Sequence, residues 1–182
     1  VLMINEQLEA FQNGLTLLSR LSPKVYVCHA EGANIPKSQI STIRYETFAG
    51  PHPAGLPGTH IHFLEPVSDT KTVWHLSTQE VIAMGMLFTT GKLYVDRVIS
   101  LAGPVVRQPR LIRTRLGANT NDLVENELVG EQSCRVISGS VLAGHRCAGW
   151  STYQGRYHEQ VSVISEEQPR LFLHWLNPWL KQ

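Results

Sequence analysis

The sequence predicts an open α/β sheet followed by an α+β unit of β-grasp type. Helix-like and strand-like segments alternate over roughly the first hundred residues, as they do in βαβ units. The alternation stops at Ala102-Gly103-Pro104, beyond which about four strand-like segments accompany one short helix. We therefore expect one domain over residues 1–103 and a second over residues 104–176, with residues 177–182 beginning a further region.

The first part begins with an expected helix from Asn5 to Arg20. Apolar residues recur in it at helical spacing, Asn5 is suited to cap its start, and Ser22-Pro23 ends it. Residues 24–28 read as a buried strand of parallel type. The strand that normally precedes such a helix is absent or reduced to residues 1–4. We therefore expect the chain to be an internal segment of a longer protein.

A second strand is expected over residues 40–48, and a second helix begins after Ser77. Ser77 and Glu80 have the spacing of a capping box, in which each side chain satisfies a backbone donor of the other residue. Gly91 is suited to end this helix in the left-handed conformation. A strand near residues 94–101 then completes a second helix–strand step of the same sheet.

Beyond the boundary, residues 110–116 alternate in polarity with a period of two, which is typical of a half-exposed strand. A short helix over residues 119–126 is expected to turn Leu123 and Val124 inward. Further strands are expected over residues 135–143, 158–164 and 170–175. Trp179 and Leu180 follow, and they would be exposed unless a further element covered them.

Composition excludes several classes of function. The chain has 182 residues and a net charge of +1, so no electrostatic argument favours nucleic-acid binding. Its three cysteines lack C-x-x-C spacing, which argues against a disulfide framework and a four-cysteine metal site. No apolar run has the length of a transmembrane segment, and no signal peptide is recognisable. A reducing, cytoplasmic setting is expected.

The segment from Gly50 to Leu64 is the most unusual stretch of the sequence. Its Gly and Pro residues argue against regular structure over most of its length. The alternating His60-Ile61-His62-Phe63 near its end predicts the start of a strand. Ordered loops of this kind usually carry function, so we expect a specifically shaped functional loop here.

The histidines of this segment have two interpretations. On a strand, His60 and His62 would share one side, and His52 or His75 would supply a third ligand to a zinc ion. Alternatively, the imidazoles anchor the loop as hydrogen-bond donors and acceptors. No Asp, Glu or Cys stands at ligand spacing beside them, which favours the second interpretation.

Other motifs carry weaker signals. No complete Gly-rich phosphate-binding motif is present. Ser138-Gly139-Ser140 lies in an expected strand and lacks the strand–turn–helix context of an activated nucleophile. A basic strip follows the domain boundary and is either a site for an acidic partner or lipid head groups, or an ordinary solvated face. Its members are Arg107, Arg110, Arg113 and Arg115.

Several long stretches are typical of one protein family, and they run from about Val25 to Trp175. They are Gly-Pro-His-Pro-Ala-Gly-Leu-Pro-Gly-Thr-His-Ile-His-Phe-Leu (50–64), Thr-Val-Trp-His-Leu (72–76), Leu-Phe-Thr-Thr-Gly-Lys-Leu-Tyr (87–94), Pro-Arg-Leu-Ile-Arg-Thr-Arg-Leu-Gly-Ala (109–118), Arg-Val-Ile-Ser-Gly-Ser-Val-Leu-Ala-Gly (135–144) and Gly-Arg-Tyr-His-Glu-Gln-Val (155–161). In these stretches the chain resembles the NqrA family, the A subunits of the bacterial Na+-translocating NADH:quinone oxidoreductase.

The resemblance implies which fold the chain has and whether it binds a cofactor. Family members are longer than this chain at both ends. Residues 1–103 would be similar to the Rossmann-like, flavin-binding domain of respiratory NADH dehydrogenases, and residues 104–176 to a soluble-ligand-binding β-grasp domain. The Gly-rich loop and cysteine cluster that relatives use for flavin and iron–sulfur centres are not visible here. The resemblance therefore implies a subunit with no cofactor of its own.

The resemblance also implies a setting. The whole complex uses NADH, flavins, iron–sulfur centres and ubiquinone, and it couples electron transfer to Na+ export. An NqrA-type subunit would be peripheral, on the cytoplasmic face of the bacterial inner membrane. It would dock on the B subunit, which lies in the membrane, beside the other subunits of the complex.

Two classes of function follow. In the first, the chain belongs to a non-redox subunit that contributes docking and quinone contact. Candidates for quinone or interface contact are His52, Thr59, His60, His62 and Trp74, and candidates for docking are Arg110, Arg113, Arg115 and Trp179. In the second, the chain is a stand-alone metal-binding module or enzyme that uses the cluster of His52, His60 and His62. Stoichiometric zinc without docking on the B subunit would favour the second class.

Overall fold

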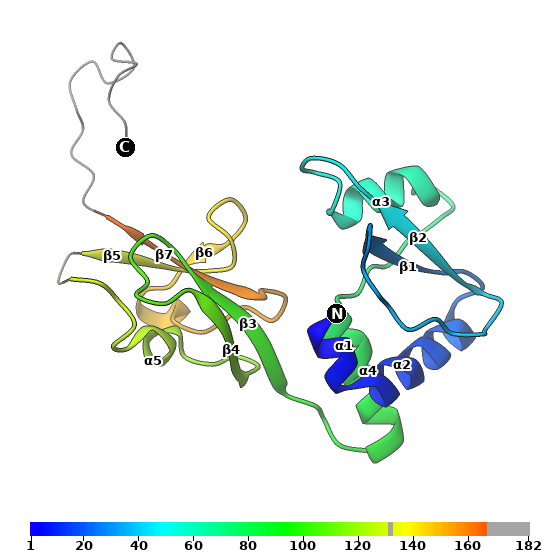
Figure 1. Cartoon of the computed structure of the whole chain (residues 1–182), viewed down its shortest axis with the longest axis horizontal. Helices are drawn as coiled ribbons and strands as arrows, with labels where there is room; N and C mark the ends of the chain where they lie inside the picture. The colour runs from blue at the N-terminus through cyan, green and yellow to red at the C-terminus, as the bar shows by residue number, and fades with distance from the viewer. Residues whose placement is uncertain (131–132, 167–182) are drawn as a thin grey trace, which may run out of the picture. The chain divides into compact units, whose positions relative to one another are not determined.

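The computed structural model describes residues 1–130 and 133–166, which divide into two compact units between Val95 and Asp96. Both units mix helices and strands, and each has its own sheet (Figure 1). The first unit consists of α1 (Leu2–Glu6), α2 (Leu8–Leu21), β1 (Val25–Ala30), β2 (Ile43–Phe48), α3 (Pro57–Leu64) and α4 (Thr78–Thr90). The second consists of β3 (Asp96–Ala102), β4 (Arg110–Arg115), α5 (Thr120–Val124), β5 (Cys134–Ser138), β6 (His145–Arg146), the 3-10 helix η1 (Gly149–Ser151) and β7 (Gln160–Ser165).

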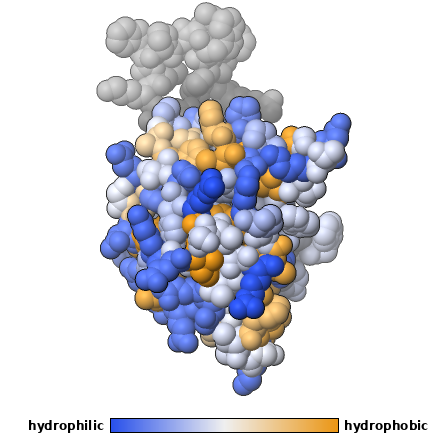
Figure 2. Space-filling view, turned by 90° about the vertical axis from the view of Figure 1, so that its right-hand side faces the viewer, coloured by the Kyte–Doolittle hydropathy of each residue, from blue (hydrophilic) through white to orange (hydrophobic). Residues whose placement is uncertain are grey.

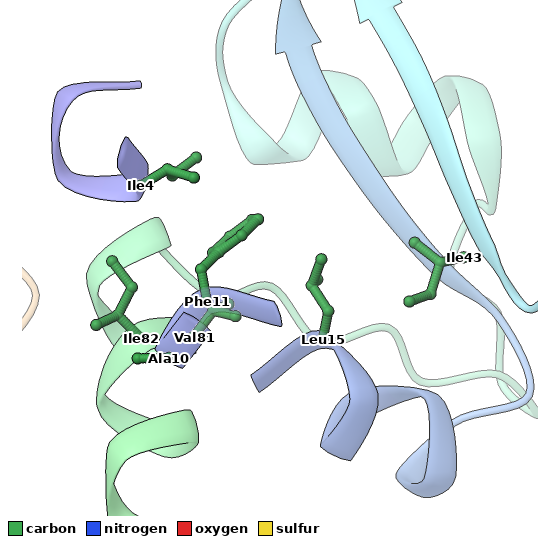
Figure 3. Packing of buried hydrophobic residues seen from close by; sticks show 7 residues of the cluster. All are labelled: Ile4, Ala10, Phe11, Leu15, Ile43, Val81 and Ile82. Atoms are coloured by element: carbon green, nitrogen blue, oxygen red, sulfur yellow. The ribbon is translucent and has the colours of Figure 1, made fainter. Parts of the chain in front are cut away.

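The sheet of the first unit contains β1 and β2, which pair in parallel from Val25 opposite Ile43 to Ala30 opposite Phe48. The two predicted strands and their parallel character are therefore confirmed. Ile43 of β2 belongs to the buried cluster that also contains side chains of α1, α2 and α4 (Figure 3). The other members of that core are Ile4, Ala10, Phe11, Leu15, Val81 and Ile82.

Two glycines let α2 and α4 pack backbone to backbone. A Cβ on Gly85 would lie 1.9 Å from the carbonyl oxygen of Ala10, and a Cβ on Gly14 would lie 2.2 Å from that of Val81. Neither distance is possible for real atoms, so the close approach of the two helices requires glycine at both positions.

The start of the chain differs from the prediction. Residues 2–6 form helix α1 rather than the remnant of a strand, and Asn5 lies inside that helix rather than at a cap. The break comes at Gln7, whose φ of -128° ends one helix before the next begins. The physical reason is burial, because the helical turn places the apolar Ile4 in the core against α2 and α4.

The predicted helix after Ser77 is confirmed as α4. Its capping box is complete, with the backbone N–H of Ser77 donating to Glu80 Oε2 at 3.1 Å. Gly91 ends the helix with a φ of 68°, as its position in the sequence predicted.

The strand expected at His60-Ile61-His62 is wrong, because these residues lie in helix α3. Pro57 occupies the first turn, where its missing N–H leaves no bond unmade and its fixed φ suits a helix. The backbone N–H of His60 donates to Leu56 at 3.2 Å, which starts the helical pattern. A four-residue alternation was too short to distinguish the two structures.

The second unit is a five-stranded sheet in the order β4-β3-β7-β5-β6. β3 was expected to extend the first sheet, but it pairs here with β4 antiparallel and with β7 parallel. The physical reason lies in the alternation of β3, which buries Arg97, Ile99 and Leu101 on one side. That side meets the core of the second unit, so the chain divides before β3 and not after residue 103.

The remaining predicted elements of this unit are largely confirmed. β4 and β7 agree closely with prediction, and β5 ends at Ser138 rather than continuing to residue 143. Helix α5 starts after Asn119, whose Oδ1 accepts the N–H of Asn121 at 3.0 Å, and Val124 is buried as expected. The strand predicted over residues 170–175 and the exposed Trp179 lie outside the described residues. Within those residues, no helix has both the length and the apolar character to cross a membrane.

Candidate functional site

Two adjacent side chains of α3 fasten the Gly- and Pro-rich loop that precedes it. Thr59 Oγ1 donates to the carbonyl oxygen of Pro53 at 3.0 Å, and His60 Nε2 donates to that of Ala54 at 2.8 Å. The ring of His60 also packs against Phe48 at the end of β2, with 4.1 Å between ring centres. The loop is therefore ordered, and His60 anchors it, as the second interpretation of the histidines proposed.

This role gives a test at His60. Replacing His60 by Ala removes a hydrogen bond and a ring contact, and we expect it to destabilise the loop by about 2 kcal/mol. Hydrogen exchange of residues 50–56 in the full-length subunit measures that change. His62→Ala is the matched control, because the His62 ring contacts only its neighbour Phe63 in the described contacts, edge-on at 5.1 Å. Equal protection in the two variants would contradict the anchoring role.

The zinc site of the first interpretation is not assembled by these histidines. Residues two apart on a helix are about 200° apart around its axis, so His60 and His62 do not share a side as they would on a strand. His60 Nε2 is also bonded to Ala54. Among the residues that the structure describes, no three His, Cys, Asp or Glu side chains are grouped as metal ligands. His52 and His75 supply no third ligand.

The surface made by this segment lacks charged side chains. Residues 47–64 contain no Asp, Glu, Lys or Arg, and we call them the uncharged segment. No residue of α3 is fully buried, and Phe63 is 72% exposed. The face drawn in Figure 2 shows small hydrophobic patches among hydrophilic side chains. An ordered, exposed and uncharged segment is typical of a surface that another molecule covers.

A charged cluster holds the end of α3 on the first sheet. The carboxylate of Glu65 forms an ion pair with Lys24, a second with Lys71 at 2.7 Å, and a hydrogen bond from the hydroxyl of Tyr26 at 3.1 Å. Hydrogen bonds from Lys24 first, then from Lys71 and Tyr26, lower the pKa of Glu65 to about 2. Glu65 thus connects the end of the uncharged segment to β1.

The low pKa of Glu65 predicts a pH dependence. An unfolded chain protonates this carboxyl near pH 4.5, whereas the folded chain does so only near pH 2. The stabilisation is therefore complete above pH 4.5 and is lost as the pH falls from 4.5 towards 2. Hydrogen exchange of the first unit over this range should show a steeper loss of protection in the wild type than in Glu65→Gln. Parallel curves would show that Glu65 contributes nothing.

The remaining interface candidates are not brought together. Trp74 lies on the segment between α3 and α4 and is 86% exposed. Among the described contacts, no hydrogen bond or ring contact joins Trp74 to His60 or His62. His52 is also exposed. The candidates therefore include one pair on α3, Thr59 and His60, which fastens the preceding loop, and three separate exposed side chains.

The basic strip is divided between the two sides of β4. Arg110 forms a bidentate pair with Glu127, with both distances 2.7 Å, so its charge is compensated. Strand alternation places Arg113 and Arg115 on the opposite side from Arg110. Arg107 Nε donates to the carbonyl oxygen of Leu128 at 2.7 Å. The four arginines therefore do not form one continuous docking surface.

Sequence reasoning missed a buried polar cluster in the second unit. Ser138 Oγ accepts the N–H of Gly155 at 2.9 Å and lies 2.9 Å from His158 Nδ1. Burial first, and then the nearby His145, lower the pKa of His158. Because Ser138 is fully buried, its hydroxyl connects two turns rather than attacking a substrate. Ser138 is separated by 17 and 20 residues from Gly155 and His158, and no local sequence motif predicts these contacts.

Each of the two units matches a known family model. Residues 1–93 match the family model described as "NqrA second alpha/beta domain", and residues 98–149 match "NQRA C-terminal domain". The chain is 57% identical over 175 residues to the A subunit of the Na(+)-translocating NADH-quinone reductase of Cellvibrio japonicus (strain Ueda107), a match that covers 96% of this chain and 39% of that protein.

Other relatives with the same name are similar to this chain to nearly the same degree. The proteins of the same name from Pseudomonas aeruginosa (strain UCBPP-PA14) and Histophilus somni (strain 2336) are 56% and 54% identical over 174 and 178 residues. The matches cover 96% and 97% of this chain. They cover 39% and 40% of the relatives, so the chain spans about two fifths of their length.

Proposed function

Because the chain belongs to the NqrA family, the A subunits of Na+-translocating NADH-quinone reductases, we propose that it is part of a peripheral subunit of such a complex. The complex would couple electron transfer from NADH to ubiquinone to the export of Na+. This subunit would lie on the cytoplasmic face of the membrane, dock on the membrane-embedded B subunit, and carry no redox centre of its own.

The uncharged segment carries the docking proposal. A helix of a protein without partners normally turns charged residues to solvent, but α3 exposes Phe63 and His62 instead. Thr59 and His60 fix the preceding loop in one shape, which lowers the entropy lost on association. Interface cores are depleted in charged residues, as this segment is, and they often contain aromatic side chains such as the exposed Phe63.

Assembly of the full-length subunit tests the proposal directly. When tagged, the full-length subunit should co-purify with the other subunits in equal stoichiometry from membranes. Purification of the tagged protein alone under the same conditions would overturn the complex-subunit function. Absorbance of bound flavin, or stoichiometric iron, in the isolated full-length subunit would contradict the absence of a redox centre.

We also propose that this subunit contacts quinone, and one hydrogen bond limits which residues are available for that contact. A quinone head group needs hydrogen-bond donors beside an apolar slot. His60 Nε2 already donates to Ala54, so the remaining candidates with ring nitrogens are the exposed residues His52, His62 and Trp74. A photoreactive quinone analogue added to the intact complex should label residues 52–74, and labelling confined to another subunit would contradict quinone contact here.

The finer fold assignments are also proposals. The parallel pair of β1 and β2 beside α2 and α4 supports a partial Rossmann-like arrangement in the first unit. The mixed five-stranded sheet with the short helix α5 supports a β-grasp assignment of the second. A crystal structure of the full-length subunit, with all strands of both sheets, tests both assignments.

A further inference from the structure

The turn between β5 and β6, residues 139–144, places two aliphatic side chains in solvent. Val141 is 57% exposed and Leu142 is 91% exposed. An aliphatic side chain with this exposure contributes little apolar burial to its own unit. At the tip of a turn, it has the shape to enter a pocket of another molecule.

Backbone packing holds this turn in one conformation. The N–H of Gly144 donates to the carbonyl oxygen of Ser140 at 2.8 Å, and the N–H of Ala143 donates to the Ser140 hydroxyl at 3.2 Å. A Cβ on Gly144 would lie 2.4 Å from the carbonyl oxygen of Ser138, so the base of the turn is closely packed. A preformed turn loses little conformational entropy on binding.

The surroundings of the turn indicate the kind of partner. The His158 ring packs against Gly139, where a Cβ would lie 3.2 Å from it, and the His145 ring centre is 5.3 Å from that of His158. The guanidinium of Arg156 lies 5.9 Å from the centre of the Tyr157 ring. Residues 139–158 contain no Lys, Asp or Glu. Aromatic residues and Arg without Lys or carboxylates are typical of protein interfaces.

We propose that the β5–β6 turn docks in an apolar pocket with an acidic rim on another protein subunit of the same complex. Leu142 and Val141 would fill the pocket, and carboxylates of the partner would face Arg156 and His145. The charge argument rests on the exposed Arg156, because residues 139–158 contain no Asp or Glu and Arg146 in this range already pairs with Glu166 at 3.4 Å. The proposal rests on the complex-subunit function proposed above, and it adds a second contact on the second unit.

The test uses the full-length subunit and the purified remainder of the complex. Leu142→Asp should weaken their association at least about tenfold, because it places a charge in the pocket and opposite the acidic rim. Val129→Asp is the matched control, because Val129 is an aliphatic residue that is 51% exposed and lies outside the turn. Arg156→Gln should slow association and reduce its dependence on salt.

The possible results of this association experiment lead to different conclusions. If the wild-type subunit fails to associate, the complex-subunit function is wrong. If the wild type associates and Leu142→Asp associates equally well, only the docking of the turn is overturned. Loss of binding to vesicles of anionic phospholipid by Leu142→Asp, with assembly unchanged, would assign the turn to the membrane and overturn the proposal. A loss of self-association only, measured by light scattering, would assign it to a second copy and also overturn it.

Discussion

Replacing Phe63 by Asp in the full-length subunit is expected to weaken its association with the rest of the complex at least about thirtyfold, which corresponds to about 2 kcal/mol. Phe63 is 72% exposed on α3, so the substitution costs its own unit little packing. In the docked state, the same substitution would bury a charge in a segment that carries none over residues 47–64. Association of the purified components, followed by surface plasmon resonance, measures the loss.

Phe88→Asp is the matched control for this experiment. Phe88 is also an exposed aromatic residue of the first unit, at 69%, but it lies near the end of α4 rather than on the uncharged segment. We expect Phe88→Asp to associate within about threefold of the wild type. If the two variants were equally impaired, the effect would follow from exposed aromatic residues in general and not from the uncharged segment.

Replacing Gly85 by Ala is expected to destabilise the first unit by about 3 kcal/mol. Intrinsic helix propensity predicts the opposite sign, because Ala is favoured over Gly by about 1 kcal/mol inside a helix. Packing decides the result, since the new Cβ would meet the backbone of Ala10 at 1.9 Å and that of Gly14 at 2.9 Å. Backbone atoms cannot rotate away, so α2 would have to move from α4 and open the core around Phe11.

Hydrogen exchange of α2 and α4 in the full-length subunit measures this change, and Gly58→Ala is its control. Gly58 lies in α3, and a Cβ there would meet nothing within 4 Å. Ala at this position should be neutral or stabilising by up to about 1 kcal/mol. A Gly85→Ala variant as well protected as the wild type would show that the two helices do not need their close approach.

Local chemistry accounts for the parts of the fold that the sequence predicted. The capping box at Ser77 and Glu80, the glycine that ends α4, and the alternation of β4 are determined by neighbouring residues, so they were visible without the structure. The family resemblance rested on long stretches of sequence and was also correct.

Errors arose where distant contacts determine the structure. Residues 2–6 become helical because Ile4 reaches a core built by residues far along the chain. β3 is the next element after α4 in the chain, yet its partners are β4 and β7. His60 was expected on a strand, but it lies in helix α3, where its ring bonds Ala54 and packs against Phe48. The Ser138–His158 contact is equally invisible from local sequence.

Photo-crosslinking from position 63 tests most directly whether the uncharged segment is a docking surface. p-Benzoylphenylalanine in place of Phe63 keeps an aromatic side chain on α3, and illumination of the assembled complex links it to whatever lies in contact. The account predicts a crosslink to another subunit of the complex, mapped by mass spectrometry, and none from the same probe at position 88. Crosslinks from position 63 confined to its own subunit would contradict it.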